Sequence, residues 1–81
     1  MTVIVYSRPR CVQCSATYRA LDSAGIDYET TDVSQDTEAL ARVRALGYAQ
    51  APVVTTDTDH WSGFRPDKIS DLVHATAKAH R

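Results

Sequence analysis

Two cysteines, Cys11 and Cys14, are the residues of this chain whose type and spacing are best suited to chemistry. The three-residue spacing puts both sulfurs on one side of a first helical turn. Cys11 falls near the predicted helix start, where unpaired backbone N–H groups and the positive end of the helix dipole favour an anion. A thiolate there should have a lowered pKa, and the thiolate is the reactive form of cysteine. Cys14 should be more buried and less ionised.

This asymmetry between the two sulfurs suits thiol–disulfide exchange. Cys11 would attack a substrate disulfide and form a mixed disulfide, and Cys14 would then attack Cys11 and release the reduced substrate. The product is an intramolecular disulfide, which another donor must reduce. Arg8 and Arg10 add positive charge nearby. Three roles stay open for Arg10: it lowers the pKa of Cys11, it attracts an acidic partner segment, or it is a solvated loop charge.

Three other uses of the cysteine pair compete with redox chemistry. A structural disulfide would close a loop of only four residues, for which the chain-entropy relation gives roughly 2 kcal/mol of stabilisation. A zinc ion needs four ligands, and without a second cysteine pair His60, His74 or His80 would have to converge on the two sulfurs. Inert free thiols are the third alternative. The position of the pair at a strand-to-helix junction favours a redox motif over all three.

Length and composition indicate one domain over residues 1–81. Hydrophobic residues make up 43% of the chain and charged residues 23%, and a net charge of −1 provides no global field for nucleic acid or membrane. The first apolar run, residues 3–6, is too short for a signal peptide or a membrane span. We therefore expect a cytoplasmic protein, in a reducing compartment where a cysteine pair is more often catalytic or metal-binding than structural.

The first half of the chain has the pattern of two strand–helix units. Residues 2–6 and 26–33 are predicted strands, rich in β-branched and apolar side chains. A helix should run from about Val12 to Gly25. Its apolar face would be Cys14, Tyr18 and Leu21, with Thr17 and Ala24 beside them. The second helix should have Ser34 as its N-cap and end at Gly47. Its first turn would hold Asp36 and Glu38, and its apolar face Leu40, Val43 and Leu46, with Arg42 and Arg44 pointing away.

The second half predicts a hairpin and a last helix. Residues 53–56 and 60–62 are predicted strands joined by a turn-rich segment. Pro66 and Asp67 should open the last helix, with an inner face of Ile69, Leu72, Val73 and Thr76 or Ala77. The element order is therefore β-α-β-α-β-β-α. The first two strands should be parallel and the last two antiparallel, with helices on both faces of one four-stranded mixed sheet, an α/β fold.

Several segments resemble a known family. Val5-Tyr6-Ser7 leading into Cys11-Val12-Gln13-Cys14 is similar to the start of glutaredoxin-like proteins of the thioredoxin fold. The segments Ala51-Pro52-Val53 and Trp61-Ser62-Gly63-Phe64-Arg65-Pro66-Asp67 extend this likeness and together resemble the NrdH-redoxins, from Thr2 to about Leu72. The stretch that begins at Trp61 is the specific part, because many redoxins share the cysteine pair. The resemblance implies one domain with the thioredoxin/glutaredoxin-like fold and a redox-active disulfide between Cys11 and Cys14.

The resemblance also implies binding residues. Pro52 would be a cis-proline facing the cysteine pair, letting the Ala51 backbone pair with an extended substrate strand; the residues alone are equally compatible with a trans-proline opening an edge strand. The partner-binding set would be Arg8, Arg10, Ala51, Pro52, Trp61, Ser62, Gly63 and Phe64. Two roles stay open for Trp61, which either helps partner docking or packs under the last helix, whereas for Phe64 packing under the last helix is favoured. Arg65 and Asp67 should pair with each other, cap the helix or contact a partner.

The function that the resemblance implies is that of an electron carrier. A monomer without bound cofactor or metal would reduce the large subunit of class Ib ribonucleotide reductase, and thioredoxin reductase, a flavoprotein, would recharge it with electrons from NADPH. One alternative is a glutathione-dependent glutaredoxin. Such proteins usually carry Cys-Pro-Tyr-Cys, and a Gly-Gly turn followed by an acid that holds the glutathione amine; this chain has Val12-Gln13 and Ser62-Gly63-Phe64-Arg65 instead. The other is a redox-sensing or metal-binding regulator, although such relatives usually have an added helical region.

Overall fold

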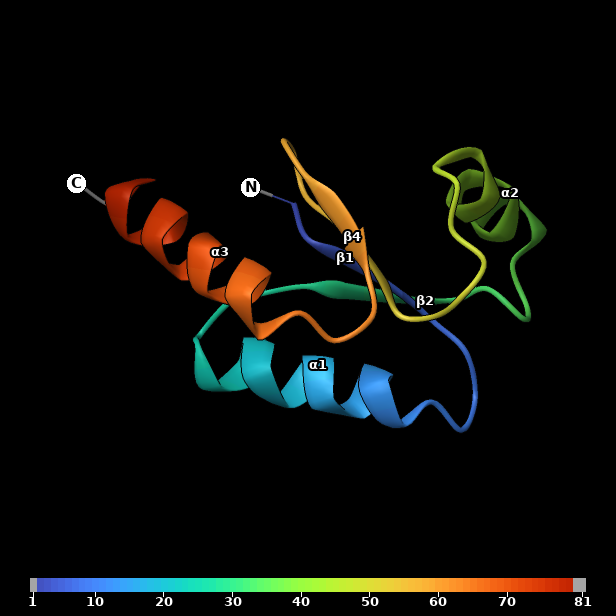
Figure 1. The fold of residues 1–81 in the computed structure, drawn as a ribbon, viewed down its shortest axis with the longest axis horizontal. Helices are drawn as coiled ribbons and strands as arrows, with labels where there is room; N and C mark the ends of the chain where they lie inside the picture. Colours follow the sequence, from blue (N-terminus) through green and yellow to red (C-terminus); the bar gives the residue numbers. More distant parts are fainter. Residues whose placement is uncertain (1, 80–81) are drawn as a thin grey trace.

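In the part of the chain that the structure describes, four short strands form one mixed sheet at the centre of the molecule (Figure 1). The structure, a computed structural model, describes residues 2–79, with side-chain burial for residues 2–74. The strands are β1 Ile4–Ser7, β2 Glu29–Asp32, β3 Val53–Thr55 and β4 His60–Ser62, in the sheet order β2-β1-β3-β4. β1 pairs parallel with β2 and antiparallel with β3, and β3 and β4 form an antiparallel hairpin. The predicted element order and strand directions are confirmed.

Within residues 2–79, three helices cover the two faces of this sheet. α1 Val12–Ser23 and α3 Pro66–Ala79 lie on one face, and α2 Thr37–Ala45 lies on the other (Figure 1). Successive strand side chains point to opposite faces, so the sheet carries a core on each side. The core under α1 and α3 contains Val3, Val5, Leu21, Ile26, Val54, Trp61, Ile69 and Leu72. The smaller core under α2 contains Tyr6, Ala39, Val43 and Val53.

The first strand–helix unit differs from its prediction in its strands. β1 begins two residues later than expected, and β2 covers only the C-terminal part of the predicted strand over residues 26–33. Ile26 is instead a buried residue of the connection between α1 and β2, and it packs in the core under α1. α1 begins at Val12 as predicted, and its buried residues include Cys14 and Leu21. The helix is therefore anchored through the same turns that carry the cysteines.

The N-cap of α2 is Asp36, so the prediction of Ser34 is wrong. An N-cap side chain must reach an unpaired N–H of the first turn. The Asp36 carboxylate accepts a hydrogen bond from the N–H of Ala39 at 3.0 Å. Ser34 turns back instead, and its N–H and hydroxyl both donate to Asp32, at 2.9 and 2.6 Å. The buried face of α2 is Ala39 and Val43, while Leu40 and Leu46 are only partly buried.

The last helix begins at Pro66 as predicted and packs beside α1 (Figure 1). Ile69 and Leu72 are buried on its inner face, whereas Val73, predicted to join them, is 37% exposed. The side chains of Thr76 and Ala77 lie outside the described residues. Within residues 2–79, no helix has both the length and the apolar character that a membrane crossing needs.

Candidate active site

Cys11 is the N-cap of α1, at the end of the loop that leaves β1. Its backbone is extended, and its sulfur accepts a hydrogen bond from the N–H of Cys14 at 3.1 Å. This N–H belongs to the first helical turn, whose donors have no partner inside the helix. A negative charge on the Cys11 sulfur would therefore be stabilised both by that N–H and by the positive end of the helix dipole.

Cys14 lies one turn further along and faces the core. It is 2% exposed, whereas Cys11 is partly exposed. The two cysteines form a disulfide, with their Cα atoms 5.1 Å apart. The difference in burial expected from the sequence is thus observed. A molecule approaching from solvent can therefore contact Cys11. Cys14 is buried behind Cys11, close enough to form the disulfide with it.

Two arginines occupy the loop between β1 and Cys11. Arg8 and Arg10 are both exposed, so both charges are available to an anionic partner segment. Arg10 also has a left-handed backbone, with φ of 59°. This conformation costs a residue with a side chain about 1–2 kcal/mol. The sequence carried no signal for this position, because a residue with positive φ is usually glycine or asparagine and not arginine.

Ser62, the last residue of β4, and the two residues that follow it join two other segments of the site, the loop before β3 and the first turn of α1. The Ser62 hydroxyl donates to the Gln50 carbonyl at 3.1 Å, and the Gly63 N–H donates to the Pro52 carbonyl at 2.8 Å. The Phe64 N–H donates to Oε1 of Gln13 at 3.1 Å. The loop before β3 and the first turn of α1 are thereby held on either side of the same loop. This places the proline segment beside the cysteine turn.

The Ala51–Pro52 peptide bond is cis, as the resemblance implied. Pro52 is buried and Ala51 is half-buried at the start of β3. The pairing of β3 with β1 ends at Val53 and Tyr6, so the Ala51 backbone lies beyond the ladder. Ala51 and Arg8 line one cavity, which places Ala51 beside the loop that leads to the cysteines.

The two aromatic residues of the partner-binding set have different surroundings. Trp61 is 3% exposed and packs in the core under α1 and α3, which is the packing alternative of the sequence analysis, so any part it has in partner docking is through the loop that it anchors. Its register partner is Val54, which faces the same core. Phe64 was expected to pack under the last helix, but it is 38% exposed. Trp61 therefore anchors the loop, and Phe64 is the aromatic side chain at the surface.

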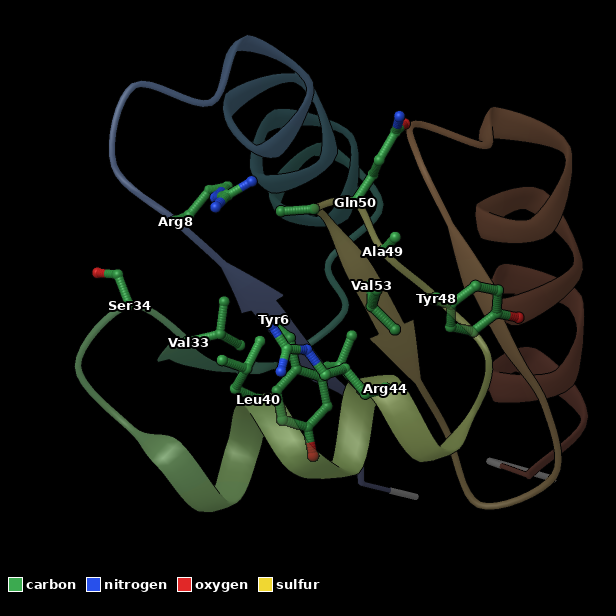
Figure 2. A pocket seen from close by; sticks show the side chains of 12 residues that line it. Tyr6, Arg8, Val33, Ser34, Leu40, Arg44, Tyr48, Ala49, Gln50 and Val53 are labelled. Atoms are coloured by element: carbon green, nitrogen blue, oxygen red, sulfur yellow. The ribbon is translucent and has the colours of Figure 1, made fainter.

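A cavity of about 230 Å³ opens on the α2 side of the site (Figure 2). Its apolar lining residues include Tyr6, Val33, Leu40, Val43 and Val53, and its polar ones Arg8, Ser34, Arg44, Tyr48 and Gln50. Figure 2 shows Arg8 on the loop after β1 and Arg44 on α2. The sequence did not predict this cavity, because its walls come from four separate segments.

The charged residues after Phe64 pair with each other. Arg65 donates two hydrogen bonds to Asp67, at 3.0 and 2.8 Å, and this is the pairing alternative expected from the sequence. The guanidinium holds the pKa of Asp67 below its usual range, and the carboxylate raises the pKa of Arg65. The pair is exposed, so its contribution to stability is small. Within residues 2–79, no three His, Cys, Asp or Glu side chains are grouped as metal ligands.

Gln13 is a site residue that sequence reasoning missed. It differs from the tyrosine of the usual glutaredoxin motif, and this difference was its only signal. In the structure its side-chain carbonyl accepts a hydrogen bond from the backbone N–H of Phe64, which is 51 residues away in the chain. Val12, the residue before Gln13, is 84% exposed, so an exposed apolar side chain lies between the two cysteines in the sequence. A long amide side chain between two cysteines is compatible with many contacts, and no local pattern selects this one.

Comparisons with known proteins agree with this geometry. The Glutaredoxin family model matches residues 3–61. Glutaredoxin-like protein NrdH of Escherichia coli (strain K12) is 46% identical over 72 residues, which is 89% of each chain. The solved structure of NrdH-redoxin from Escherichia coli has a TM-score of 0.86 and covers 89% of this chain and 95% of that one. A buckwheat glutaredoxin solved with glutathione has a TM-score of 0.70 at 23% identity, over 88% of this chain and 70% of its own, and shows the shared fold alone.

The fold and the cysteine pair define a redoxin, a small thiol–disulfide oxidoreductase with a redox-active disulfide between Cys11 and Cys14. Its four-stranded sheet with helices on both faces is the thioredoxin/glutaredoxin-like fold that the resemblance implied. The chain belongs to the glutaredoxin family and, within it, to the NrdH-redoxins.

Proposed function

We propose that the protein is an electron carrier that reduces the large subunit of class Ib ribonucleotide reductase and is recharged by thioredoxin reductase. NADPH would supply the electrons through that flavoprotein, in the reducing cytoplasm. The observation that carries the chemistry is the asymmetry of the two sulfurs. Cys11 is partly exposed, and its sulfur accepts a hydrogen bond from an N–H of the first helical turn. Cys14 lies behind it and is 2% exposed. The choice of partners rests on the resemblance to the NrdH-redoxins.

The cycle begins with the reduced protein. The Cys11 thiolate attacks one sulfur of the partner disulfide; the partner S–S bond breaks, and its other sulfur leaves as a thiolate that takes up a proton. Cys14 then loses its proton and attacks the Cys11 sulfur. The mixed disulfide breaks, the second partner sulfur is protonated, and the Cys11–Cys14 disulfide forms. The partner has gained two electrons and two protons. Thioredoxin reductase returns the same number from NADPH and solvent.

The surface beside Cys11 suits an extended partner segment. The Ala51 backbone lies beyond the strand ladder and can pair with a substrate strand. The neighbouring cavity offers apolar walls with Arg8 and Arg44, which fit apolar and acidic side chains of that segment. Phe64 and Val12 add exposed apolar surface on the side of Gln13. We assign partner contact to these residues, and to Arg10 for its charge.

The proposal is tested by coupled electron transfer. The oxidised protein is mixed with NADPH, thioredoxin reductase and the disulfide form of the ribonucleotide reductase large subunit, and NADPH consumption is followed. We expect turnover that depends on all four components. If the wild-type protein gives no NADPH consumption with thioredoxin reductase, the proposed electron source is wrong.

The roles of the two cysteines are tested by trapping. Cys14→Ser should accumulate a covalent mixed disulfide with the large subunit, because the second attack is lost. Cys11→Ser should accumulate none, because the exposed nucleophile is lost. Trapping by Cys11→Ser and not by Cys14→Ser would reverse the assignment. Gln35→Ala, an exposed change in the loop before α2, serves as a control that should behave as wild type.

A further inference from the structure

Tyr48, in the loop that joins α2 to β3, contacts His60 of β4 through both its hydroxyl and its ring. Oη of Tyr48 and Nδ1 of His60 share a hydrogen bond at 2.8 Å, and the two rings meet edge to face with their centroids 5.6 Å apart. The same hydroxyl lies 3.4 Å from the His60 carbonyl, to which it can donate. A hydroxyl and an imidazole nitrogen can each donate or accept, so either group can supply the proton of the short bond. The contact joins this loop to an edge strand of the sheet.

The ring of Tyr48 is also held from the other side of the loop. It is partly buried and packs against the core under α2. In Figure 2 its hydroxyl points away from the other labelled side chains that line the cavity. The core therefore fixes the ring, His60 fixes the hydroxyl, and the loop is anchored at Tyr48.

This anchor lies just before the backbone that a partner strand would use. From Tyr48 the chain runs through Ala49 and Gln50 to Ala51 and the cis-proline. Ser62 shares a sheet face with His60, and its hydroxyl donates to the Gln50 carbonyl at 3.1 Å. Side chains of β4 thus hold the loop at two points on the way to Ala51. A loop that spent part of its time out of place would bind a partner strand more weakly by that fraction.

We propose that Tyr48 and His60 are positioning residues for protein substrates, because their contact holds the Ala51 backbone where an extended partner segment can pair with it. Neither side chain takes part in the attack on a disulfide, which the Cys11 sulfur makes. A small disulfide, which has no strand to pair, gains little from the contact. The inference deepens the proposed function and rests on it only for the docking of an extended segment beside Ala51.

The experiment compares how the reduced protein reduces a protein disulfide and a small disulfide. Insulin and hydroxyethyl disulfide are the two substrates, and each is mixed in excess with reduced protein that is free of other thiols. In one turnover the substrate S–S bond breaks and takes up two electrons and two protons, while the Cys11–Cys14 bond forms. Acid quenching and mass spectrometry follow the new bond and give a second-order rate constant for each substrate.

Tyr48→Phe keeps the ring and removes only the hydroxyl. Its rate constant with insulin should fall by about fivefold, the value of one net hydrogen bond, and its rate constant with hydroxyethyl disulfide by less than about twofold. His60→Leu should show the same selective loss, and the double variant should be no slower than either single variant. His60→Asn carries an amide that reaches the position of Nδ1, so its rate constant with insulin should return toward wild type.

Tyr28→Phe is the matched control for the loss of a tyrosine hydroxyl. Tyr28 directly precedes β2, which runs parallel to β1. It therefore lies at the end of the sheet opposite to the loop that leads from β1 to Cys11. Both rate constants of Tyr28→Phe should equal those of the wild type.

An equal loss toward both substrates in Tyr48→Phe would overturn the proposal, since the contact would then only stabilise the fold, and so would the absence of any loss with insulin. A His60→Asn protein as slow as His60→Leu would do the same. So would a wild type that reacts no faster with insulin than with hydroxyethyl disulfide, because a docked segment would then bring no advantage.

The two substitutions remove the same bond from opposite sides, so either one tests it if the other variant does not fold. Reduction of the ribonucleotide reductase large subunit by the wild type is measured separately, and its failure overturns the proposed function alone.

Discussion

The backbone N–H of Cys14 donates a hydrogen bond to the sulfur of Cys11 at 3.1 Å, one turn into a helix that begins at Val12. The residue that supplies this N–H also supplies the second sulfur, which is 2% exposed. One helical turn therefore does two things. It presents an anion-stabilising donor to the outer sulfur, and it hides the inner sulfur behind it.

This relationship predicts unequal alkylation of the two thiols. In the reduced protein at neutral pH, Cys11 should react with iodoacetamide at least about tenfold faster than Cys14, because exposure and thiolate character both favour it. Mass spectrometry of peptides after timed quenching measures both rates. Denaturation in urea is the control and should remove most of the difference. Equal rates in the folded protein would show that the helical turn does not separate the sulfurs.

The α2 N-cap gives a prediction on stability. Asp36→Ala removes the acceptor for the Ala39 N–H and should cost about 1 kcal/mol. Ser34→Ala removes only an exposed hydrogen bond to Asp32 and should cost less than about 0.5 kcal/mol. The free energy of unfolding of the oxidised proteins in urea compares the two. A larger loss for Ser34→Ala would mean that Ser34 and not Asp36 limits the stability of the helix start.

The parts of the fold that the sequence predicts are those with local, periodic signals. The alternation of apolar and polar residues and the helical spacing of apolar residues predict the ends of β3, β4 and α1 to within a residue or two. The position of Cys11 directly before the first helical residue, Val12, follows from them. The N-cap of α2 was missed because Ser34 and Asp36 are both good capping residues two positions apart. Only the path of the chain decides which side chain reaches Ala39.

The candidate site was predictable in its cysteines and less so in its loop. Trp61 lies in a strand, and its register with Val54 puts it in the core, but that register exists only once the hairpin has formed. Phe64 follows Gly63 in a loop without periodicity, so its exposure has no sequence signature. The bond between Gln13 and Phe64 spans 51 residues and depends on how two elements pack.

The hydrogen-bonded ion pair between Lys68 and Asp59 predicts that the stability of the protein depends on pH. Lys68 of α3 donates to the Asp59 carboxylate at 3.0 Å. This bond, and next the N–H of His60, hold the pKa of Asp59 below its usual range. A carboxylate with a lowered folded-state pKa stabilises the protein above its unfolded-state pKa, and the effect is lost as pH falls through the folded-state value.

We therefore expect Lys68→Met to lower the urea midpoint slightly at neutral pH, and the difference from wild type to shrink below about pH 4. Unfolding curves of both proteins across this range provide the measurement. High salt at neutral pH should reduce the same difference, because the pair is exposed. A difference that stays constant from neutral to acid pH would assign the effect of Lys68 to packing of its side chain.

Gly63 and Gly47 form a matched pair for testing the contact with Gln13. Both have positive φ, of 85° and 90°, so alanine at either position should cost about 1–2 kcal/mol in backbone strain. A Cβ at Gly47 meets nothing within 4 Å, whereas one at Gly63 meets Oε1 of Gln13 at 3.3 Å. Gly63→Ala should therefore cost a further ~0.5–1 kcal/mol, which is the value of the hydrogen bond between Phe64 and Gln13 that it disturbs.

A double-mutant cycle isolates that additional cost. In a Gln13→Ala background the amide is absent, so Gly63→Ala should cost no more than Gly47→Ala does, and the coupling energy between positions 13 and 63 should be about 0.5–1 kcal/mol. Urea unfolding of the four proteins gives this energy, and Gly47→Ala in the same background should show none. Equal losses of stability for Gly63→Ala and Gly47→Ala in the wild type, together with zero coupling energy between positions 13 and 63, would mean that the Gln13 amide does not contact this loop in solution.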